Sequence, residues 1–408
     1  MPERSPAPVV VHAGPARPTA RVRLAVFAVG ATLAIVFVFL VPAGLPYDEP
    51  SHWQNVTFYA SHHTMPVIGD RGVSYEAQMG PVAYVVDAVL TLGFGGASRA
   101  AFYGVRLLGA IELLVFAGLI GAVVRRSLPA EENAAVFATA CVLFNPMLLT
   151  MAASVQNDIL ALCLATGALL AMTGASVGRA TSALSGCLVG LALITKLIVW
   201  PIGLVLGVSL VLRRKWLEAF IFVSTATLVS GWWFVRNEYL YGDLTGRRGV
   251  IDAGYHFPPL GHIDPIGLVR SVMTYLWLPT EYVRNVVDAP GWVDLLVVAL
   301  SLAGAFGVVR VVVRLWPGRS VVTLVAIAVL AVATWLVTAI ATQAVAFRFA
   351  YAALPLWFLG LGGLVLLRGG RAIAVLVLVA ELCVSGWFLL SVSDLSPLLT
   401  RFTPDGRP

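Results

Sequence analysis

Long apolar runs fill most of the chain, and short polar stretches separate them. A run of about 20 apolar residues is long enough to cross a bilayer as a helix. The apolar run at 81–94 is too short for that, so we expect it to lie in the membrane interface. The fold class is therefore predicted to be an all-α polytopic membrane protein with interfacial helices. We expect about eleven spanning helices, at 24–43, 101–124, 134–153, 158–176, 181–196, 198–212, 217–235, 292–313, 320–342, 352–367 and 372–391.

Basic residues between these runs indicate the orientation. If the N-terminus is cytoplasmic, every basic cluster falls on the cytoplasmic side, as the positive-inside rule requires. The loops at 46–100 and 237–290 then lie on the external side. Treating 81–94 as a full span would reverse every later helix and place the basic clusters outside. These clusters are Arg125 and Arg126; Arg179; Arg213, Arg214 and Lys215; Arg310, Arg314 and Arg319; and Arg368 and Arg371.

The two ends of the chain differ from the apolar middle. Residues 1–23 are rich in Pro, Ala and Arg, which is typical of a disordered tail, here cytoplasmic. A cleaved signal peptide is the competing interpretation, but a signal of about 15 to 30 residues is shorter than this tail plus the first helix. We expect one transmembrane domain at 24–392, which contains both external loops, and a short C-terminal tail at 393–408. The aromatic residues of the 237–290 loop favour an ordered lid.

Composition excludes an ordinary soluble domain. The chain has 408 residues, of which 59% are hydrophobic and 12% charged, whereas about a quarter of residues are charged in soluble proteins. The net charge of +6 follows from the basic cytoplasmic loops, so we expect no nucleic acid partner. The four cysteines lie in apolar runs without Cys-x-x-Cys spacing, which excludes a redox pair or a cysteine metal clamp.

An acidic pair follows the first apolar run directly. Asp48 and Glu49 emerge where that helix meets water, and carboxylates at such a depth are costly and usually functional. If a helix restarts at Pro50, His52 lies within side-chain reach of both acids. The alternative is that the two acids only cap the next helix.

Two segments of this loop resemble the first external loop of the GT-C glycosyltransferases. They read Asp48-Glu49-Pro50-Ser51-His52 and Tyr75-Glu76-Ala77-Gln78-Met79-Gly80-Pro81-Val82-Ala83-Tyr84, with Gly80 where the family motif has its first proline. The family consists of integral membrane enzymes that take sugars from polyprenyl-phosphate carriers. The resemblance implies such a donor, and it implies that Glu76 and Gln78 bind substrate.

Asp48 is the expected catalytic base. Transfer from a sugar phosphate needs a base that takes the proton of the attacking acceptor hydroxyl, and partial desolvation raises the basicity of a carboxylate. Glu49 is the second expected catalytic residue. His52 is expected to orient Asp48, to bind the acceptor, or to join the acids in holding a divalent metal. No cofactor is certain, and metal binding stays open.

Further candidates for substrate binding lie at the external ends of helices. Asp158, in Asn157-Asp158, either caps a helix or belongs to the site. Lys196, Arg236 and Arg348 lie in segments that resemble pieces of bacterial GT-C proteins, and cations are suited to the donor phosphate. The alternative for each cation is that it reaches to lipid headgroups. Arg106 is expected to line the same cavity.

The predicted function is transfer of a hexosyl or pentosyl group from a polyprenyl-phosphate donor on the external face of the plasma membrane. The acceptor is a glycan, lipid, protein or small molecule. The alternatives are a transporter or lipid flippase, and a structural membrane protein. The chain shows no internal repeat or helix broken at mid-membrane, features that transporters often have. The acidic loop and external cations have no explanation in a purely structural protein.

Overall fold

The computed structural model describes residues 20–46, 48–174, 177–254, 265–283, 287–342 and 346–393. Within these ranges every regular element is helical. Most of the predicted tails and parts of the 237–290 loop lie outside the described residues. The helices of the first half are α1 (Ala20–Leu40), α2 (Glu49–His62), η1 (Tyr75–Gln78), α3 (Val82–Gly93), α4 (Arg99–Ser127), α5 (Glu132–Phe144), α6 (Pro146–Ala152), α7 (Asp158–Met172), α8 (Arg179–Leu193), η2 (Leu197–Val199) and α9 (Trp200–Leu212). Those of the second half are α10 (Trp216–Tyr241), α11 (Arg247–Asp252), α12 (Pro265–Trp277), α13 (Gly291–Leu315), α14 (Arg319–Thr342), η3 (Phe347–Ala353), α15 (Leu354–Gly363), η4 (Leu364–Leu366) and α16 (Gly370–Ser393).

The described helices confirm an all-α protein, and several of them are long enough to span a membrane. Seven are long and apolar enough to cross a bilayer, and the bent pair of α5 and α6 makes an eighth if it counts as one span. The predicted number of about eleven is not confirmed. The difference lies in α7, α8 and η2–α9, which are apolar but have fewer than 18 residues. At 1.5 Å per residue, the 15 residues of α7 and of α8 are each about 22 Å long.

The predicted span at 134–153 is two helices that meet at 60°. Asn145 and Pro146 cause the break, because proline has no backbone N–H and disfavours helical geometry in the residue before it. The Asn145 side chain satisfies the freed groups: its Oδ1 accepts from the backbone N–H of Leu148, and its Nδ2 donates to the carbonyl oxygen of Leu276, at 2.7 Å. The bend thus fixes α6 against the end of α12.

Glycines let α8 and α10 pack with their backbones close together. A Cβ atom added at Gly186 would lie 2.4 Å from the carbonyl oxygen of Phe222, and one at Gly190 would lie 2.8 Å from that of Ala226. The two glycines are four residues apart and so share one face of α8. Such small residues are the usual way for membrane helices to approach closely.

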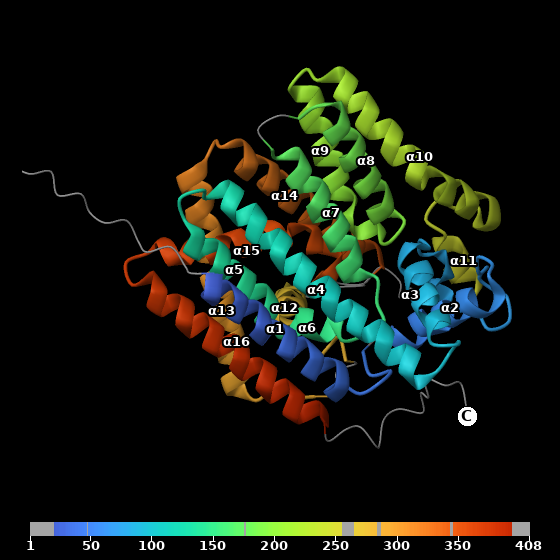
Figure 1. Cartoon of the computed structure of the whole chain (residues 1–408), viewed down its shortest axis with the longest axis horizontal. Helices are drawn as coiled ribbons and strands as arrows, with labels where there is room; N and C mark the ends of the chain where they lie inside the picture. Colours follow the sequence, from blue (N-terminus) through green and yellow to red (C-terminus); the bar gives the residue numbers. More distant parts are fainter. Residues whose placement is uncertain are drawn as a thin grey trace, which may run out of the picture.

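The first loop is a folded layer at one end of the helix bundle. Figure 1 shows α2, α3 and α11 gathered beside the N-terminal end of α4 and the C-terminal end of α10. Trp53, Tyr84 and Phe102 belong to a small hydrophobic core that is separate from the main one. With 12 residues, α3 is about 18 Å long, which is too short to span a bilayer of about 30 Å. This layer holds the predicted site residues of the first loop against the bundle.

Candidate active site

Asp48 lies in a buried polar cluster and pairs with Arg348. It stands just before α2, which begins at Glu49 and has Pro50 in its first turn, where proline is well tolerated. Its Oδ2 atom lies 2.7 Å from Nη2 of Arg348, and its Oδ1 atom accepts a hydrogen bond from the Tyr75 hydroxyl at 3.1 Å. Arg348 comes from η3, 300 positions away in the chain. The fold therefore joins the first loop to the C-terminal half at this residue.

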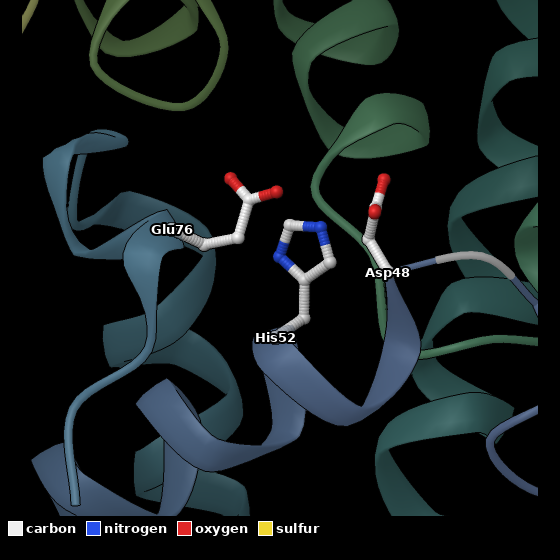
Figure 2. Close-up of side chains that lie close together, drawn as sticks. All are labelled: Asp48, His52 and Glu76. Atoms are coloured by element: carbon white, nitrogen blue, oxygen red, sulfur yellow. The ribbon is translucent and has the colours of Figure 1, made fainter. Parts of the chain in front are cut away.

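His52 and Glu76 complete the group around Asp48. His52 lies one turn further along α2, and Glu76 comes from η1 on the opposite side, so that the imidazole lies between two carboxyl groups (Figure 2). Nδ1 of His52 is hydrogen-bonded to the Tyr84 hydroxyl at 2.8 Å. Its Nε2 atom and Oε2 of Glu76 have no hydrogen-bond partner among the described residues. Two buried polar atoms are thus left for a bound group.

Burial and charge set different proton affinities for these three side chains. Burial raises the pKa of Asp48, but Arg348 and the other cations nearby outweigh it and hold the pKa below its usual range. Burial lowers the pKa of His52 to about 4, and Lys196 adds to the effect. Burial, together with the charge of Asp48, raises the pKa of Glu76 to about 7. At neutral pH, Asp48 is charged, His52 is neutral and Glu76 is close to half protonated.

A second ion pair lies in the same cluster. Nζ of Lys196 is 2.5 Å from Oδ2 of Asp158, and both side chains are almost fully buried. Asp158 is the first residue of α7, where a carboxylate is stabilised by the helix dipole. Oδ1 of Asp158 has no hydrogen-bond partner within the described part of the chain. Lys196 and Arg348 therefore place two cations at one polar site, as the sequence predicts.

Glu49 makes a different ion pair, with Arg106 of α4. Nε and Nη2 of Arg106 bind the two carboxylate oxygens at 2.7 and 2.6 Å, and both side chains are fully buried. The carboxylate also accepts from the backbone N–H groups of Gly44 and Val155. Arg106 donates further to carbonyl oxygens at the end of α1, those of Val38, Val41 and Pro42. Both carboxylate oxygens of Glu49 thus have partners in the protein.

Arg236 and Gln78 lie beside the cluster rather than in its ion pairs. Nη2 of Arg236 donates to the Pro66 carbonyl oxygen at 2.7 Å, and the guanidinium stacks over Trp233. The Gln78 carbonyl oxygen accepts from the side chains of Trp233 and Asn237. Among the described residues, Arg236 pairs with no acid. The predicted convergence of three cations is therefore seen for Lys196 and Arg348, while Arg236 binds the Pro66 carbonyl oxygen.

An apolar cavity of about 290 Å³ lies beside the cluster, between α10, α14 and η3, and shares Lys196 with it. Lys196 and Gln78 lie in its wall, and Phe349 follows Arg348 directly. The remaining lining residues are mostly apolar: Met79, Gly80, Leu193, Leu197, Ile198, Trp200, Trp233, Phe234, Asn237, Thr245, Thr334 and Thr338. An aliphatic chain with a charged end fits such a lining.

The glycine that departs from the family motif has a packing reason. A Cβ atom on Gly80 would lie 1.9 Å from the carbonyl oxygen of Ile194. The same oxygen accepts a hydrogen bond from the backbone N–H of Val82 at 3.3 Å. Gly80 therefore lets the first loop approach the segment before Lys196, which sets the distance between Glu76 and the second ion pair.

Asp48, His52 and Glu76 have the donor atoms that a divalent metal needs. Each offers one ligand atom, and these atoms lie within 4.8 Å of one another. Imidazole and carboxylate together suit Zn²⁺ and related ions, and Nε2 of His52 and Oε2 of Glu76 are buried without a hydrogen-bond partner among the described residues. The three residues fit a metal ion. The positive charges of Lys196 and Arg348 nearby oppose the binding of such a cation.

The sequence alone does not identify several residues that contact the candidate site. Arg106 and Glu112 are the two charges within the apolar part of α4, which marks Arg106 as important but does not identify Glu49 as its partner. Tyr75 and Tyr84 belong to the second motif segment, yet only the structure shows that their hydroxyls bind Asp48 and His52. Tyr282, whose hydroxyl bonds Ser154, has no sequence signal of this kind.

No family model and no curated protein matches the chain. Solved structures of membrane glycosyltransferases do match its fold. ArnT from Cupriavidus metallidurans, solved with undecaprenyl phosphate, superposes with a TM-score of 0.60 at 17% identity, over 93% of this chain and 75% of ArnT. The mycobacterial arabinofuranosyltransferase AftD gives 0.59 at 18% identity, over 96% of this chain and 28% of AftD.

The oligosaccharyltransferase of Archaeoglobus fulgidus gives a TM-score of 0.56 at 14% identity, over 92% of this chain. The chain spans 56% of that enzyme's length. At identities this low, the similarity shows the fold and does not show the substrates. The fold implied by the two motif segments is confirmed: the chain has the GT-C fold of integral membrane glycosyltransferases.

Proposed function

We propose that the protein transfers a sugar from a polyprenyl-phosphate donor to an acceptor hydroxyl, with Asp48 as the general base. The observation that carries this proposal is the contact of Asp48 with Arg348 in a buried cluster whose Lys196 also lines an apolar cavity. An acid beside a cation suits a reaction in which one group takes a proton while the other binds a phosphate.

The donor's two parts match the two parts of the site. The ArnT neighbour was solved with undecaprenyl phosphate and an archaeal oligosaccharyltransferase with dolichol-phosphate. In this chain the cavity takes part of the apolar polyprenyl chain, and its wall includes Lys196. Lys196 and Arg348 bind the phosphate oxygens and stabilise the negative charge that grows as the glycosidic bond breaks. The leaving group is the polyprenyl phosphate, which needs no proton.

Donor binding makes Asp48 a better base. Without a donor, Arg348 holds the pKa of Asp48 below its usual range. A phosphate that draws the guanidinium toward itself weakens this pairing, and its own negative charge raises the pKa of the carboxylate further. Asp48 then takes the proton of the acceptor hydroxyl as the oxygen attacks the anomeric carbon. Asp48 is therefore most basic when the donor is bound.

The other residues of the cluster support this step. Glu49, whose oxygens are all bound, positions Asp48 by fixing the start of α2 to Arg106. His52 is neutral and offers Nε2 to the acceptor, while Glu76 and Gln78 line the substrate side and Asp158 holds Lys196. A divalent metal bound by Asp48, His52 and Glu76 would supply further charge stabilisation for the phosphate. The site lies on the external face of the plasma membrane, as the basic loops imply.

Proteoliposomes that contain a defined polyprenyl-phosphate sugar and an acceptor mixture test this proposal. Release of free polyprenyl phosphate, measured by mass spectrometry, reports transfer without knowledge of the acceptor. We expect release that depends on the protein and is lost when Lys196→Ala and Arg348→Ala are combined. Movement of the intact donor between leaflets, with no polyprenyl phosphate formed, would instead support the flippase alternative.

A further inference from the structure

A basic pocket lies at the far end of several helices that build the candidate active site. We define it by its three cations, Arg213, Lys215 and Arg319, which line a cavity of about 420 Å³. Its other lining residues come from the end of α7, the segment before α8, the end of α9 and the start of α14: Met172, Thr173, Gly174, Val177, Leu212, Ser320 and Thr323.

The basic pocket is on the opposite side of the molecule from Asp48. α7 begins at Asp158 in the active-site cluster and ends beside Thr173 in the pocket. α14 begins at the pocket and carries Thr334 and Thr338 to the wall of the apolar cavity. Along α4, Arg106 contacts Glu49 while Arg126 binds Thr173, and the 20 residues between them (126 minus 106) span about 30 Å. That is the thickness of a bilayer core.

The charge of the basic pocket is uncompensated. None of its lining residues is acidic, and within the described part of the chain no carboxylate lies within 4.0 Å of its three cations. Arg126 adds a fourth cation next to Thr173 and Ser320. The hydroxyls of Ser320 and Thr323 and the N-terminus of α14 supply further donors. Together these groups suit a ligand with several anionic oxygens.

Exposed apolar residues around the basic pocket indicate that the ligand is a lipid. Leu212 is 78% exposed, Trp216 64% and Trp316 55%. Tryptophans at helix ends mark the headgroup level of a membrane, and both of these flank pocket cations within three residues. A soluble anion would need the cations but not this apolar rim.

We propose that the basic pocket binds the phosphate headgroup of an anionic phospholipid in the leaflet opposite the candidate active site. Basic pockets between transmembrane helices recognise such headgroups through the same chemistry. The acyl chains lie along the exposed apolar faces of α9 and α14. This site is separate from the donor site and does not depend on the proposed transfer.

Native mass spectrometry of the full chain, exchanged into mixed phosphatidylglycerol and phosphatidylcholine, tests the proposal. The pocket variant is Arg213→Gln with Arg319→Gln. Ser320→Trp fills the pocket and keeps every cation, so it leaves the charges that orient the chain in the membrane. The control is Arg368→Gln with Arg371→Gln, which removes two exposed basic residues elsewhere. Thermal unfolding with added phosphatidylglycerol or inorganic phosphate gives a second readout.

We expect the wild type and the control to retain phosphatidylglycerol over phosphatidylcholine. Affinity should fall about fivefold for each pocket cation removed, from the usual contribution of one basic residue at an anionic surface. Ser320→Trp should lose retention as well. Equal retention by all four proteins would overturn the proposal and leave the cations with a topological role. Stabilisation by inorganic phosphate alone, without retained lipid, would overturn the lipid assignment.

Discussion

Arg348 and Arg236 have the same predicted role, binding of the donor phosphate, but different surroundings in the structure. Both lie in segments that resemble GT-C proteins, but Arg348 contacts Asp48 whereas Arg236 binds the Pro66 carbonyl oxygen. We expect Arg348→Ala to lower transfer by roughly 10- to 150-fold, the value of a hydrogen bond to a charged group. Arg348→Lys keeps the charge but loses the planar fork, so its loss should be smaller.

The measurement is the initial rate of polyprenyl phosphate release at several donor concentrations. Arg236→Ala is the matched control, and its loss should be well below that of Arg348→Ala. If the two alanine variants lose equal activity, Arg348 has no special role at the donor phosphate.

Glu76 gives the site a distinct pH signature. Its folded pKa of about 7 lies above the ordinary value of 4.5, so between these values the folded protein holds a proton that the unfolded chain releases. Stability from this group is therefore present at low pH and falls as pH rises through 7, by on the order of 3 kcal/mol in total. Glu76→Gln removes the titration and should flatten the fall in melting temperature between pH 5 and about 8.

Thermal unfolding of both proteins in detergent across that range checks the prediction. Asp243→Asn, at an exposed turn away from the cluster, serves as the control. Parallel curves for the wild type and Glu76→Gln would show that Glu76 is not protonated in the folded state.

The Glu49–Arg106 pair acts at the scale of elements, because it ties the end of α1 and the start of α2 to α4. Loss of one partner leaves a buried, unpaired charge, which costs about 3–5 kcal/mol. Glu49→Gln and Arg106→Met should each lower the melting temperature strongly, and the double variant should recover part of the loss. Strictly additive losses would argue against the pairing.

Most element boundaries follow from the apolar pattern, with differences that have local causes. The span predicted at 217–235 continues to Tyr241 because its last turns pack against the first loop and end at Gly242, which takes the left-handed conformation. The span at 134–153 breaks because Asn145 can cap a new helix. Hydropathy averages over such single residues and so cannot reveal them.

At the scale of the whole molecule, the sequence groups candidate residues that lie in one loop but does not predict which distant residues meet. Asp48, Glu76 and His52 lie in one loop, so a motif is enough to group them. The ion pairs of Asp48 with Arg348 and of Glu49 with Arg106 join distant segments, and only the packing of the bundle decides these partners. The catalytic role of Glu49 stays a prediction, and its contacts favour positioning.

Orientation in the membrane is tested at the two ends of α4. Its 29 residues are about 43 Å long, and exposed alanines flank it at Ala97 and Ala130. In a background without native cysteines, Ala97→Cys should react with an impermeant thiol reagent added to intact cells. Ala130→Cys should react only after permeabilisation. The reverse pattern would place the candidate site on the cytoplasmic side.

Asp48→Asn in the purified, reconstituted protein tests the proposed catalysis most directly. The change removes the base and almost no volume, so the variant should insert and still bind donor. Its melting temperature should be lower than that of the wild type, because the buried Arg348 charge loses its carboxylate partner, and transfer is therefore compared at a temperature at which both proteins are folded. We predict that sugar transfer from a polyprenyl-phosphate donor, followed as polyprenyl phosphate release, falls at least about 100-fold, the lower range for loss of a general base. Wild-type transfer by Asp48→Asn would contradict the assignment of Asp48 as the base.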